Sequence, residues 1–318
     1  MPCNPCLNLA PALPFQSKKT VNNKKGALMT LPLIKWIDTE WLKENLNNPQ
    51  IRIIDCQPDV HDYIKEHIEG AVYLNENHFR AFYSNLPTHY SPTECIGKLL
   101  QWAGIQNEKT TVIYGGNGVF SKIGDGLEQS MVAYSLGRFG VKDICILNGG
   151  LEKWKEKNYP LSKEYPLIPP SDFQPSVQDE FFYNYKQFCE IKDRPETTIV
   201  DVRPRVIYEG KAMWSKPGHI PRAINLPWRV LMDHDNPRLL KPLEKIAELV
   251  KGRKIFPDKS IVLYCGTGRE ATSAFLVLKY AMNFPDVRIF EGSFTEWCTH
   301  PENLTVTGPS PVKIKSEP

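Results

Sequence analysis

Cys265 is the residue whose surroundings in the sequence best suit covalent chemistry. It follows residues 260–264 (SIVLY), an uncharged apolar run typical of a strand buried on both faces of a parallel sheet. It precedes a two-glycine loop and then residues 271–280, whose apolar side chains recur at the spacing of one helix face. We therefore expect the thiol to stand where a strand ends and a helix begins.

That junction would favour the ionised form of the thiol. The first-turn amides of a helix, and those of a loop over residues 266–268, lack intrahelical partners and can point at an anion. Gly266 and Gly268 suit such a loop, because glycine adopts positive φ without a Cβ clash. A cysteine with a pKa near ~8.5 is only about 3% ionised at pH 7, whereas a pKa of about 6.5 makes roughly three quarters of it thiolate. The pattern predicts a nucleophilic thiolate with a lowered pKa; an inert buried cysteine is the alternative.

The composition is that of a globular protein with room for two domains. The chain has 318 residues, of which 41% are hydrophobic and 24% charged, and a net charge of +3 is too small to indicate nucleic-acid binding. No run of about 18 apolar residues is present to span a membrane. The eight cysteines are scattered, which indicates reduced thiols and a cytoplasmic protein. The basic N-terminus leaves organellar targeting open, and the lone Cys3–Cys6 pair is a poor zinc site.

The chain carries the same succession of motifs twice. An Asp-ended strand, a His-Ile motif, an apolar strand and a Gly-to-Trp motif occur in this order in each copy. The paired segments are residues 53–55 and 199–201, 67–72 and 218–224, 111–114 and 261–264, and 146–154 and 289–297. Strands that alternate with helical patterns predict an α/β fold, with a doubly wound, mainly parallel sheet in each copy.

The repeat sets the expected domain boundaries. Residues 159–176 contain five prolines, which predict a stiff, extended linker between the copies. The expected organisation is a disordered or flexible tail (1–29), a first domain (30–158), the linker (159–176), a second domain (177–308) and a C-terminal tail (309–318).

Only the second copy has a cysteine after its central strand. In the first copy Gly115 takes that position, and the loop over residues 115–126 is longer and has no thiol. Neither common glycine-rich nucleotide motif fits this loop. We expect the first domain to be non-catalytic and to shape the cleft.

With these motifs, residues 30–308 resemble the tandem rhodanese family, which includes thiosulfate and 3-mercaptopyruvate sulfurtransferases. The resemblance is carried by the Asp201-Val202-Arg203 motif, the segment over residues 218–223, the Cys265 loop and the closing segment over residues 291–297. It implies a six-residue active-site loop over residues 265–270. It also implies that Cys265 takes a sulfane sulfur from a small-molecule donor, becomes a persulfide and passes the sulfur to cyanide, a thiol or a protein thiol. No metal or organic cofactor is implied.

The remaining expected site residues are those of the loop and one nearby arginine: Gly266, Thr267, Gly268, Arg269, Glu270 and Arg205. Glu270 departs from the Thr, Ser or Arg common at its position in the family. We expect it to face outward, since a carboxylate beside a persulfide would raise the persulfide's pKa. A guanidinium suits paired oxyanion oxygens, so Arg269 could bind thiosulfate, although a solvent-facing ion pair is the alternative.

The choice of donor depends on positions after the Asp-x-Arg motif. The 3-mercaptopyruvate enzymes of the family hold their donor with arginines there, and these positions correspond to Ile207 and Lys216, with Arg205 as a substitute. We therefore favour thiosulfate and keep 3-mercaptopyruvate as the alternative.

Other functions fit the sequence less well. A phosphatase with a related loop needs an arginine six residues after the cysteine, where Ala271 stands. A non-enzymatic binding or persulfide-carrier module remains a further alternative. Asp201, Arg203, His219 and His67 are expected to brace the sheets, and Trp154 and Trp297 to lie in the core.

Overall fold

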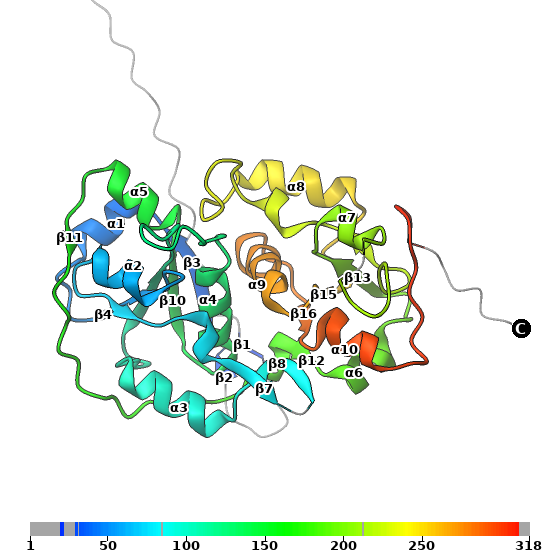
Figure 1. Ribbon diagram of the computed structural model, residues 1–318, viewed down its shortest axis with the longest axis horizontal. Helices are drawn as coiled ribbons and strands as arrows, with labels where there is room; N and C mark the ends of the chain where they lie inside the picture. Colours follow the sequence, from blue (N-terminus) through cyan, green and yellow to red (C-terminus); the bar gives the residue numbers. More distant parts are fainter. Residues whose placement is uncertain (1–19, 22–28, 31, 84, 212, 312–318) are drawn as a thin grey trace, which may run out of the picture. The chain divides into compact units, whose positions relative to one another are not determined.

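The computed structural model describes residues 20–21, 29–30, 32–83, 85–211 and 213–311 (Figure 1). Residues 1–31 and residues 32–318 form separate units. In the first unit, β1 (Thr20–Val21) and β2 (Met29–Thr30) pair antiparallel. The rest of the expected tail over residues 1–29, including Cys3 and Cys6, lies outside the described residues, as do residues 312–318 of the C-terminal tail.

The first domain alternates strands and helices. Its elements are β3 (Leu33–Ile37), α1 (Thr39–Glu44), β4 (Ile51–Asp55), α2 (Val60–Lys65), β5 (His67–Ile68), β6 (Val72–Tyr73), η1 (Glu76–His78), β7 (Arg80–Tyr83), β8 (Leu86–Tyr90), α3 (Thr93–Trp102), β9 (Thr110–Tyr114), α4 (Glu128–Arg138), β10 (Asp143–Leu147) and α5 (Gly150–Glu156). Five of these strands form a sheet in the order β3-β10-β9-β4-β6, and every pair in it is parallel.

The second domain repeats this arrangement. Its elements are η2 (Asp179–Phe181), β12 (Phe182–Tyr183), α6 (Tyr185–Ile191), β13 (Thr197–Asp201), α7 (Arg205–Tyr208), β14 (Ile224–Asn225), η3 (Trp228–Leu231), α8 (Leu243–Gly252), β15 (Ser260–Tyr264), α9 (Arg269–Leu276), η4 (Val277–Ala281), β16 (Val287–Phe290) and α10 (Ser293–Thr299). The sheet order is β12-β16-β15-β13-β14, again parallel throughout. The predicted α/β fold with two mainly parallel sheets is therefore confirmed.

Local sequence signals explain where several helices begin. The Asp38 side chain accepts a hydrogen bond from the Trp41 amide at 2.7 Å and so caps the start of α1. Asn184 and Gln187 form a reciprocal capping box at the start of α6. The helix expected over residues 271–280 is α9, but its last part winds as the π-helical turn η4.

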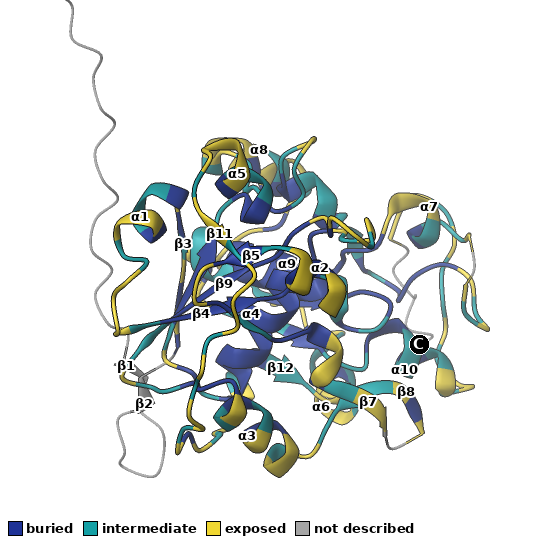
Figure 2. Ribbon diagram, turned by 60° about the vertical axis from the view of Figure 1, so that its left-hand side comes forward, coloured by how far each residue is buried: buried dark blue, intermediate teal, exposed yellow. Residues whose placement is uncertain are grey.

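The central strand of the second sheet packs against a different apolar core on each face. In β15, Ile261 and Leu263 join a large apolar cluster, whereas Val262 and Tyr264 point to a smaller outer cluster. The large cluster includes residues of both domains, and α4 and α9 pack against each other within it (Figure 1). Figure 2 shows the buried residues concentrated in these strands and in the two helices. The helices that follow the two equivalent loops thus meet in a shared core.

Ion pairs reinforce this contact between the domains. Arg138, on α4, donates through Nε and Nη2 to the two carboxylate oxygens of Glu291 at 2.6 and 3.0 Å. The pair is largely buried, and Tyr134 adds a hydrogen bond to the same carboxylate at 3.1 Å. Breaking a buried pair of this kind leaves a charge without a partner, so it strongly favours the paired domains.

The linker is extended, but it lies on the first domain. Its β11 (Leu161–Ser162) pairs antiparallel with β5, the Ser171 amide donates to the Gln101 carbonyl at 2.9 Å, and Phe173 is buried. In the part of the chain that the structure describes, no helix is long and apolar enough to cross a membrane.

Candidate active site

Cys265 occupies the junction between β15 and α9, as predicted. Residues at the start of α10 donate hydrogen bonds to the carbonyls of the Cys265 loop. The Cys265 carbonyl accepts from the Phe294 amide at 3.0 Å, and the Gly266 carbonyl accepts from the Thr295 amide and hydroxyl at 3.0 and 2.8 Å. With these carbonyls bound to α10, the loop amides are free to turn toward the sulfur.

The expected amide cradle is present. The backbone N–H groups of Thr267 and Ala271 donate to the Cys265 sulfur, one from the loop and one from the first turn of α9. Gly268 has a φ of +82°, so it supplies the left-handed backbone that glycine favours. Gly266 is required for a different reason than expected, because a Cβ there would lie 2.7 Å from Cζ2 of Trp214. The indole of Trp214 thus packs directly on the loop.

The predicted lowering of the thiol pKa is wrong for this closed arrangement. Cys265 has no exposed surface, and this burial raises its pKa to about 12, an effect to which the Glu270 carboxylate adds. The two amides and the positive charge of Arg80 act in the opposite direction. Desolvation exceeds the stabilisation by the amides, so the resting sulfur is a neutral thiol.

The expectation that Glu270 faces outward is also wrong. Its carboxylate accepts a hydrogen bond from the Gly266 amide and interacts with the Cys265 thiol. Burial raises the pKa of Glu270, with the charge of Asp201 in support. The side chain turns inward because the Gly266 amide and the thiol offer it hydrogen bonds at the start of α9. A carboxylate in this position can take up the thiol proton.

Arg269 joins the two domains. Its guanidinium donates to both oxygens of Glu76, at 2.6 and 2.7 Å for the shortest contacts, and to both oxygens of Asp125, at 2.5 and 2.9 Å. Its side chain is 25% exposed, and both carboxylates belong to the first domain. Thiosulfate binding by Arg269 stays a prediction, and it would require the guanidinium to leave these partners.

Two further residues considered from the sequence do not contact the loop. Arg205 lies on α7 with a side chain that is 71% exposed, and it pairs with Glu209 one turn away at 2.6 Å. Lys216 donates its ammonium to the carbonyls of His300, Pro301 and Asn303 at 2.6, 3.2 and 2.7 Å. Donor binding by Arg205 therefore stays a prediction.

Sequence reasoning missed Arg80, which reaches the loop from the first domain. It lies on β7, and its Nη1 donates to the Thr267 carbonyl at 2.5 Å. Nothing in the residues around position 80 marks this contact, because it depends on how the β7–β8 hairpin meets the second domain. Trp214 was missed for a similar reason, since its place over Gly266 is set by a hydrogen bond from Nε1 to Thr295 Oγ1 at 2.8 Å.

The Asp-x-Arg and His motifs form a structural network, as expected. Asp201 and Arg203 are fully or nearly fully buried and form a forked pair, and Arg203 also donates to the Gly218 carbonyl at 2.9 Å. His219 donates through Nδ1 to the Tyr208 carbonyl at 2.9 Å, and its ring stacks on that of Tyr208 with centroids 3.6 Å apart. These contacts tie the ends of β13 and the following loop together.

The corresponding residues of the first domain have equivalent roles. His67 lies between the carbonyls of Tyr63 and Glu164. Trp154 and Trp297 are core residues in their domains, and each donates through Nε1 to a carbonyl, of Pro160 and Leu304 respectively.

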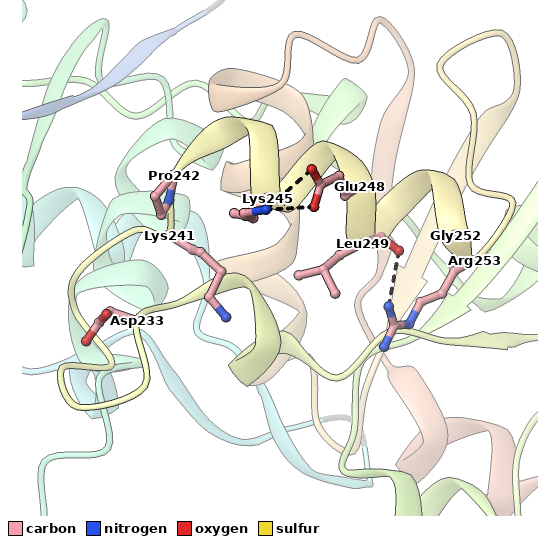
Figure 3. Close-up of a pocket in the computed structure, with 8 residues that line it drawn as sticks. All are labelled: Asp233, Lys241, Pro242, Lys245, Glu248, Leu249, Gly252 and Arg253. Atoms are coloured by element: carbon pink, nitrogen blue, oxygen red, sulfur yellow. Dashed lines mark hydrogen bonds and ion pairs between the residues drawn. The ribbon is translucent and has the colours of Figure 1, made fainter.

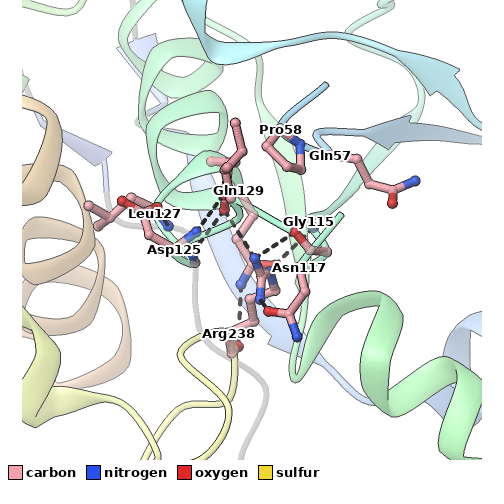
Figure 4. A network of polar contacts seen from close by, with 12 residues as sticks. Gln57, Pro58, Gly115, Asn117, Asp125, Leu127, Gln129 and Arg238 are labelled. Atoms are coloured by element: carbon pink, nitrogen blue, oxygen red, sulfur yellow. Dashed lines mark hydrogen bonds and ion pairs between the residues drawn. The ribbon is translucent and has the colours of Figure 1, made fainter. Parts of the chain in front are cut away.

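In the first domain, the loop equivalent to the Cys265 loop surrounds an arginine of the second domain (Figure 4). Arg238 is fully buried and donates to the Gly116 carbonyl at 2.6 Å and to Asn117 Oδ1 at 2.8 Å. Glu128 and Glu152 lie 3.5 and 3.6 Å from its guanidinium. This loop therefore surrounds a cation and has no space for an anionic substrate.

A separate hollow lies beside α8, and none of the residues that line it belongs to the Cys265 loop (Figure 3). Its charged side chains are largely engaged with one another or with backbone. Lys245 pairs with Glu248 at 3.2 Å, Lys241 donates to the Val230 carbonyl, and Arg253 donates to the Leu249 carbonyl at 3.1 Å. No thiol or hydroxyl side chain is among the residues that line this hollow.

Comparisons with known proteins agree with the two-domain organisation. A model of the rhodanese-like domain matches the chain twice, over residues 38–157 and 185–300. A putative thiosulfate sulfurtransferase of Synechococcus elongatus is 34% identical over 288 residues, which cover 88% of this chain and 87% of that protein. The sulfur carrier protein TtuD of Thermus thermophilus is 30% identical, over 82% of this chain and 92% of that protein.

Solved structures show the same fold. The crystal structure of the 3-mercaptopyruvate sulfurtransferase SseA of Escherichia coli has a TM-score of 0.71 and 25% identity, over 81% of this chain and 98% of that one. The residues that match the rhodanese-like model include four of the five strands of each sheet and the loop that bears Cys265. The chain therefore belongs to the rhodanese family of sulfurtransferases, with two rhodanese-like domains in tandem.

Proposed function

We propose that this protein is a thiosulfate sulfurtransferase that carries a sulfane sulfur on Cys265 as a persulfide. One observation carries the proposal. The Cys265 sulfur accepts hydrogen bonds from two backbone amides at the junction of a strand and a helix, and the equivalent junction of the first domain has no thiol. A thiolate is the attacking species in such chemistry, and amide donors can hold the additional negative sulfur of a persulfide.

The proposed reaction has two balanced steps. The Cys265 thiolate attacks the outer sulfur of thiosulfate, forms a sulfur–sulfur bond and releases sulfite with the electron pair of the broken bond. The persulfide anion then gives its terminal sulfur to cyanide, yielding thiocyanate and restoring the thiolate. A thiol or protein thiol can take the place of cyanide as the acceptor. The thiol proton must leave before the first step, and the Glu270 carboxylate is the neighbouring group that can accept it.

The thiol is closed off in the resting structure, so a donor needs the site to open. Cys265 has no exposed surface, and Trp214 packs on its loop. We propose that the loop amides of Gly266, Thr267 and Gly268 contact the donated sulfur once neighbouring side chains move. Opening of the site to water would relieve the desolvation of the sulfur and so favour the thiolate.

Thiosulfate is preferred over 3-mercaptopyruvate on two grounds. The relative with 34% identity is named as a putative thiosulfate sulfurtransferase, whereas the Escherichia coli 3-mercaptopyruvate enzyme is 26% identical. Lys216, at a position where the family's 3-mercaptopyruvate enzymes use an arginine, is engaged by three carbonyls. Steady-state rates with the two donors side by side test the choice, and a strong preference for 3-mercaptopyruvate would overturn it.

The decisive experiment is mass analysis of the protein after incubation with thiosulfate. We expect the wild-type protein to gain one sulfur mass on the Cys265 peptide, and cyanide to remove it with formation of thiocyanate. Cys265→Ser should gain none, while the matched control Cys298→Ser, on α10, should behave as wild type. Absence of the added sulfur with both donors would falsify the enzyme reading and leave a binding module.

A sulfur carrier is the second candidate, because the Thermus thermophilus relative bears that name. It predicts a stable Cys265 persulfide that passes to a protein thiol but turns over slowly with cyanide. We also propose a cytoplasmic location, where the described cysteines, all free thiols, would stay reduced.

A further inference from the structure

Arg80 differs from the other arginines at the contact between the domains. Arg138, Arg238 and Arg269 each face at least one carboxylate within ion-pair distance. Among the residues that the structure describes, no carboxylate forms an ion pair with Arg80. Its positive charge is therefore not neutralised by a fixed partner.

This uncompensated charge is held against the Cys265 loop. Nη1 of Arg80 donates to the Thr267 carbonyl at 2.5 Å, and a Cβ on Gly268 would lie 3.8 Å from the same atom. The amide of Thr267 is one of the two that point at the Cys265 sulfur. A guanidinium has five N–H donors, so the bond to Thr267 leaves others for a ligand.

A small, partly enclosed hollow lies beside Arg80 and is lined by Arg80, Tyr134, Gly268 and Glu291, among others. The Glu291 carboxylate is already paired with Arg138, so it does not neutralise Arg80. An anion that approaches Cys265 from this side would meet the Arg80 guanidinium, which is bonded to the Thr267 carbonyl and forms no ion pair with a described carboxylate.

We propose that Arg80 of the first domain is a donor-binding residue of the Cys265 site, which receives the sulfonate oxygens of thiosulfate. A planar guanidinium matches two oxygens of such a group, and the dianion needs a cation because Glu270 lies beside the sulfur. The domain without a cysteine thus supplies part of the active site. This inference deepens the proposed function and rests on it for the identity of the donor.

The electrostatics of Cys265 agree with this role. The positive charge of Arg80 lowers the pKa of the Cys265 thiol, opposing burial and the Glu270 carboxylate. The same charge would stabilise both the thiolate and the sulfite that leaves it. The other cations near the loop are occupied, Arg203 by Asp201 and Arg269 by Glu76 and Asp125.

A pair of alkylating reagents tests the charge of the site without using enzyme activity. Iodoacetate is an anion and iodoacetamide is neutral, and both react with the same thiolate, so a change in the thiol pKa cancels from the ratio of their rates. We expect Arg80→Met to lower the iodoacetate-to-iodoacetamide ratio on the Cys265 peptide about tenfold, the loss typical of one charge-assisted contact. Arg80→Lys should restore part of the ratio.

Arg194→Met is the matched control. Arg194 is an exposed arginine whose Nε donates to the Glu190 carbonyl, and its change should leave both rates as in wild type. In steady state, Arg80→Met should raise the KM for thiosulfate about tenfold, and high salt should affect the variant less than the wild type.

The outcomes separate the two proposals. An unchanged ratio, or equal slowing by both reagents, would overturn the role of Arg80 as an anion-binding residue and leave it a structural contact to Thr267. A lowered ratio in a protein that takes no sulfur from thiosulfate would keep Arg80 as an anion-binding residue and reject the proposed donor.

Discussion

The loops over residues 115–126 and 265–268 occupy the same place in two copies of one fold, yet one surrounds a guanidinium and the other a thiol. Each follows the central strand of its sheet and leads into a helix of the shared core. In the first domain the loop encloses the Arg238 guanidinium. In the second domain the loop directs amides at the Cys265 sulfur.

The two loops differ in the groups that accept hydrogen bonds from the amides near the start of the helix. In the first domain the Glu128 carboxylate, in the first turn of α4, accepts from the amides of Asp125 and Gly126 at 2.9 and 3.0 Å. In the second domain the amides of Thr267 and Ala271 donate to the Cys265 sulfur, and the Glu270 carboxylate accepts from the amide of Gly266. Both loops therefore have a first-turn carboxylate, but only the second also directs amides at a thiol, and only the first surrounds a guanidinium.

Glycines around Arg238 make room for its side chain. A Cβ on Gly124, in the longer loop, would lie 2.5 Å from Nη2 of Arg238, and one on Gly150, at the start of α5, would lie 2.6 Å from its Cδ. The glycine-rich sequence of the loop therefore accommodates an arginine of the other domain.

Removing the cation should have the largest effect. Arg238→Met leaves Glu128 buried without its partner, and we expect the free energy of unfolding to fall by about 3–5 kcal/mol. Chemical denaturation measures this loss, with Arg194→Met as the control. A loss below about 1 kcal/mol would show that the pair contributes no more than a surface ion pair.

The pH dependence of that loss sharpens the comparison. Burial raises the pKa of Glu128 to about 7, so a protonated Glu128 favours the folded state below the unfolded value, near ~4.5, and this contribution disappears as the pH rises through 7. A neutral Glu128 does not need Arg238. The deficit of Arg238→Met should accordingly be smaller at pH 5 than at pH 8.

Removing the charge of Glu270, beside the Cys265 sulfur, should have an intermediate effect. Glu270→Gln removes a negative charge that raises the Cys265 pKa, so more thiolate forms at a given pH. We expect the rate of alkylation of Cys265 by iodoacetamide at pH 8 to increase several-fold, with the pH profile displaced to lower pH. Glu296→Gln, a partly buried carboxyl on α10, is the control. A slower reaction in Glu270→Gln would instead show that loss of the proton acceptor outweighs loss of the negative charge.

A thiol placed in the first loop should not restore sulfur transfer to a protein that lacks Cys265. We expect Gly115→Cys in a Cys265→Ser background to take no sulfur from thiosulfate, because its Cβ would lie 3.3 Å from Nε of Arg238, which fills the space for the donor. Peptide mass analysis decides the point. One added sulfur on residue 115 would show that the first loop is also a competent cradle.

The sequence predicted the frame of the site from local patterns. The apolar run over residues 260–264 and the helical spacing after it place Cys265 at the junction, and the ordered repeat predicts two equivalent sheets. The Asp201 and His219 motifs and the two buried tryptophans also took their expected structural roles. These features depend on residues close to one another in the chain.

The electrostatic character of the site was decided only by the tertiary structure. Burial raised the pKa of Cys265, and the turn of Glu270 toward the sulfur added to it. Arg80, Arg238 and Arg269 each found partners more than 100 positions away in the chain, at the contact between the domains. Charge–charge energies depend on distance and on exclusion of water, and neither quantity is set until distant segments pack together.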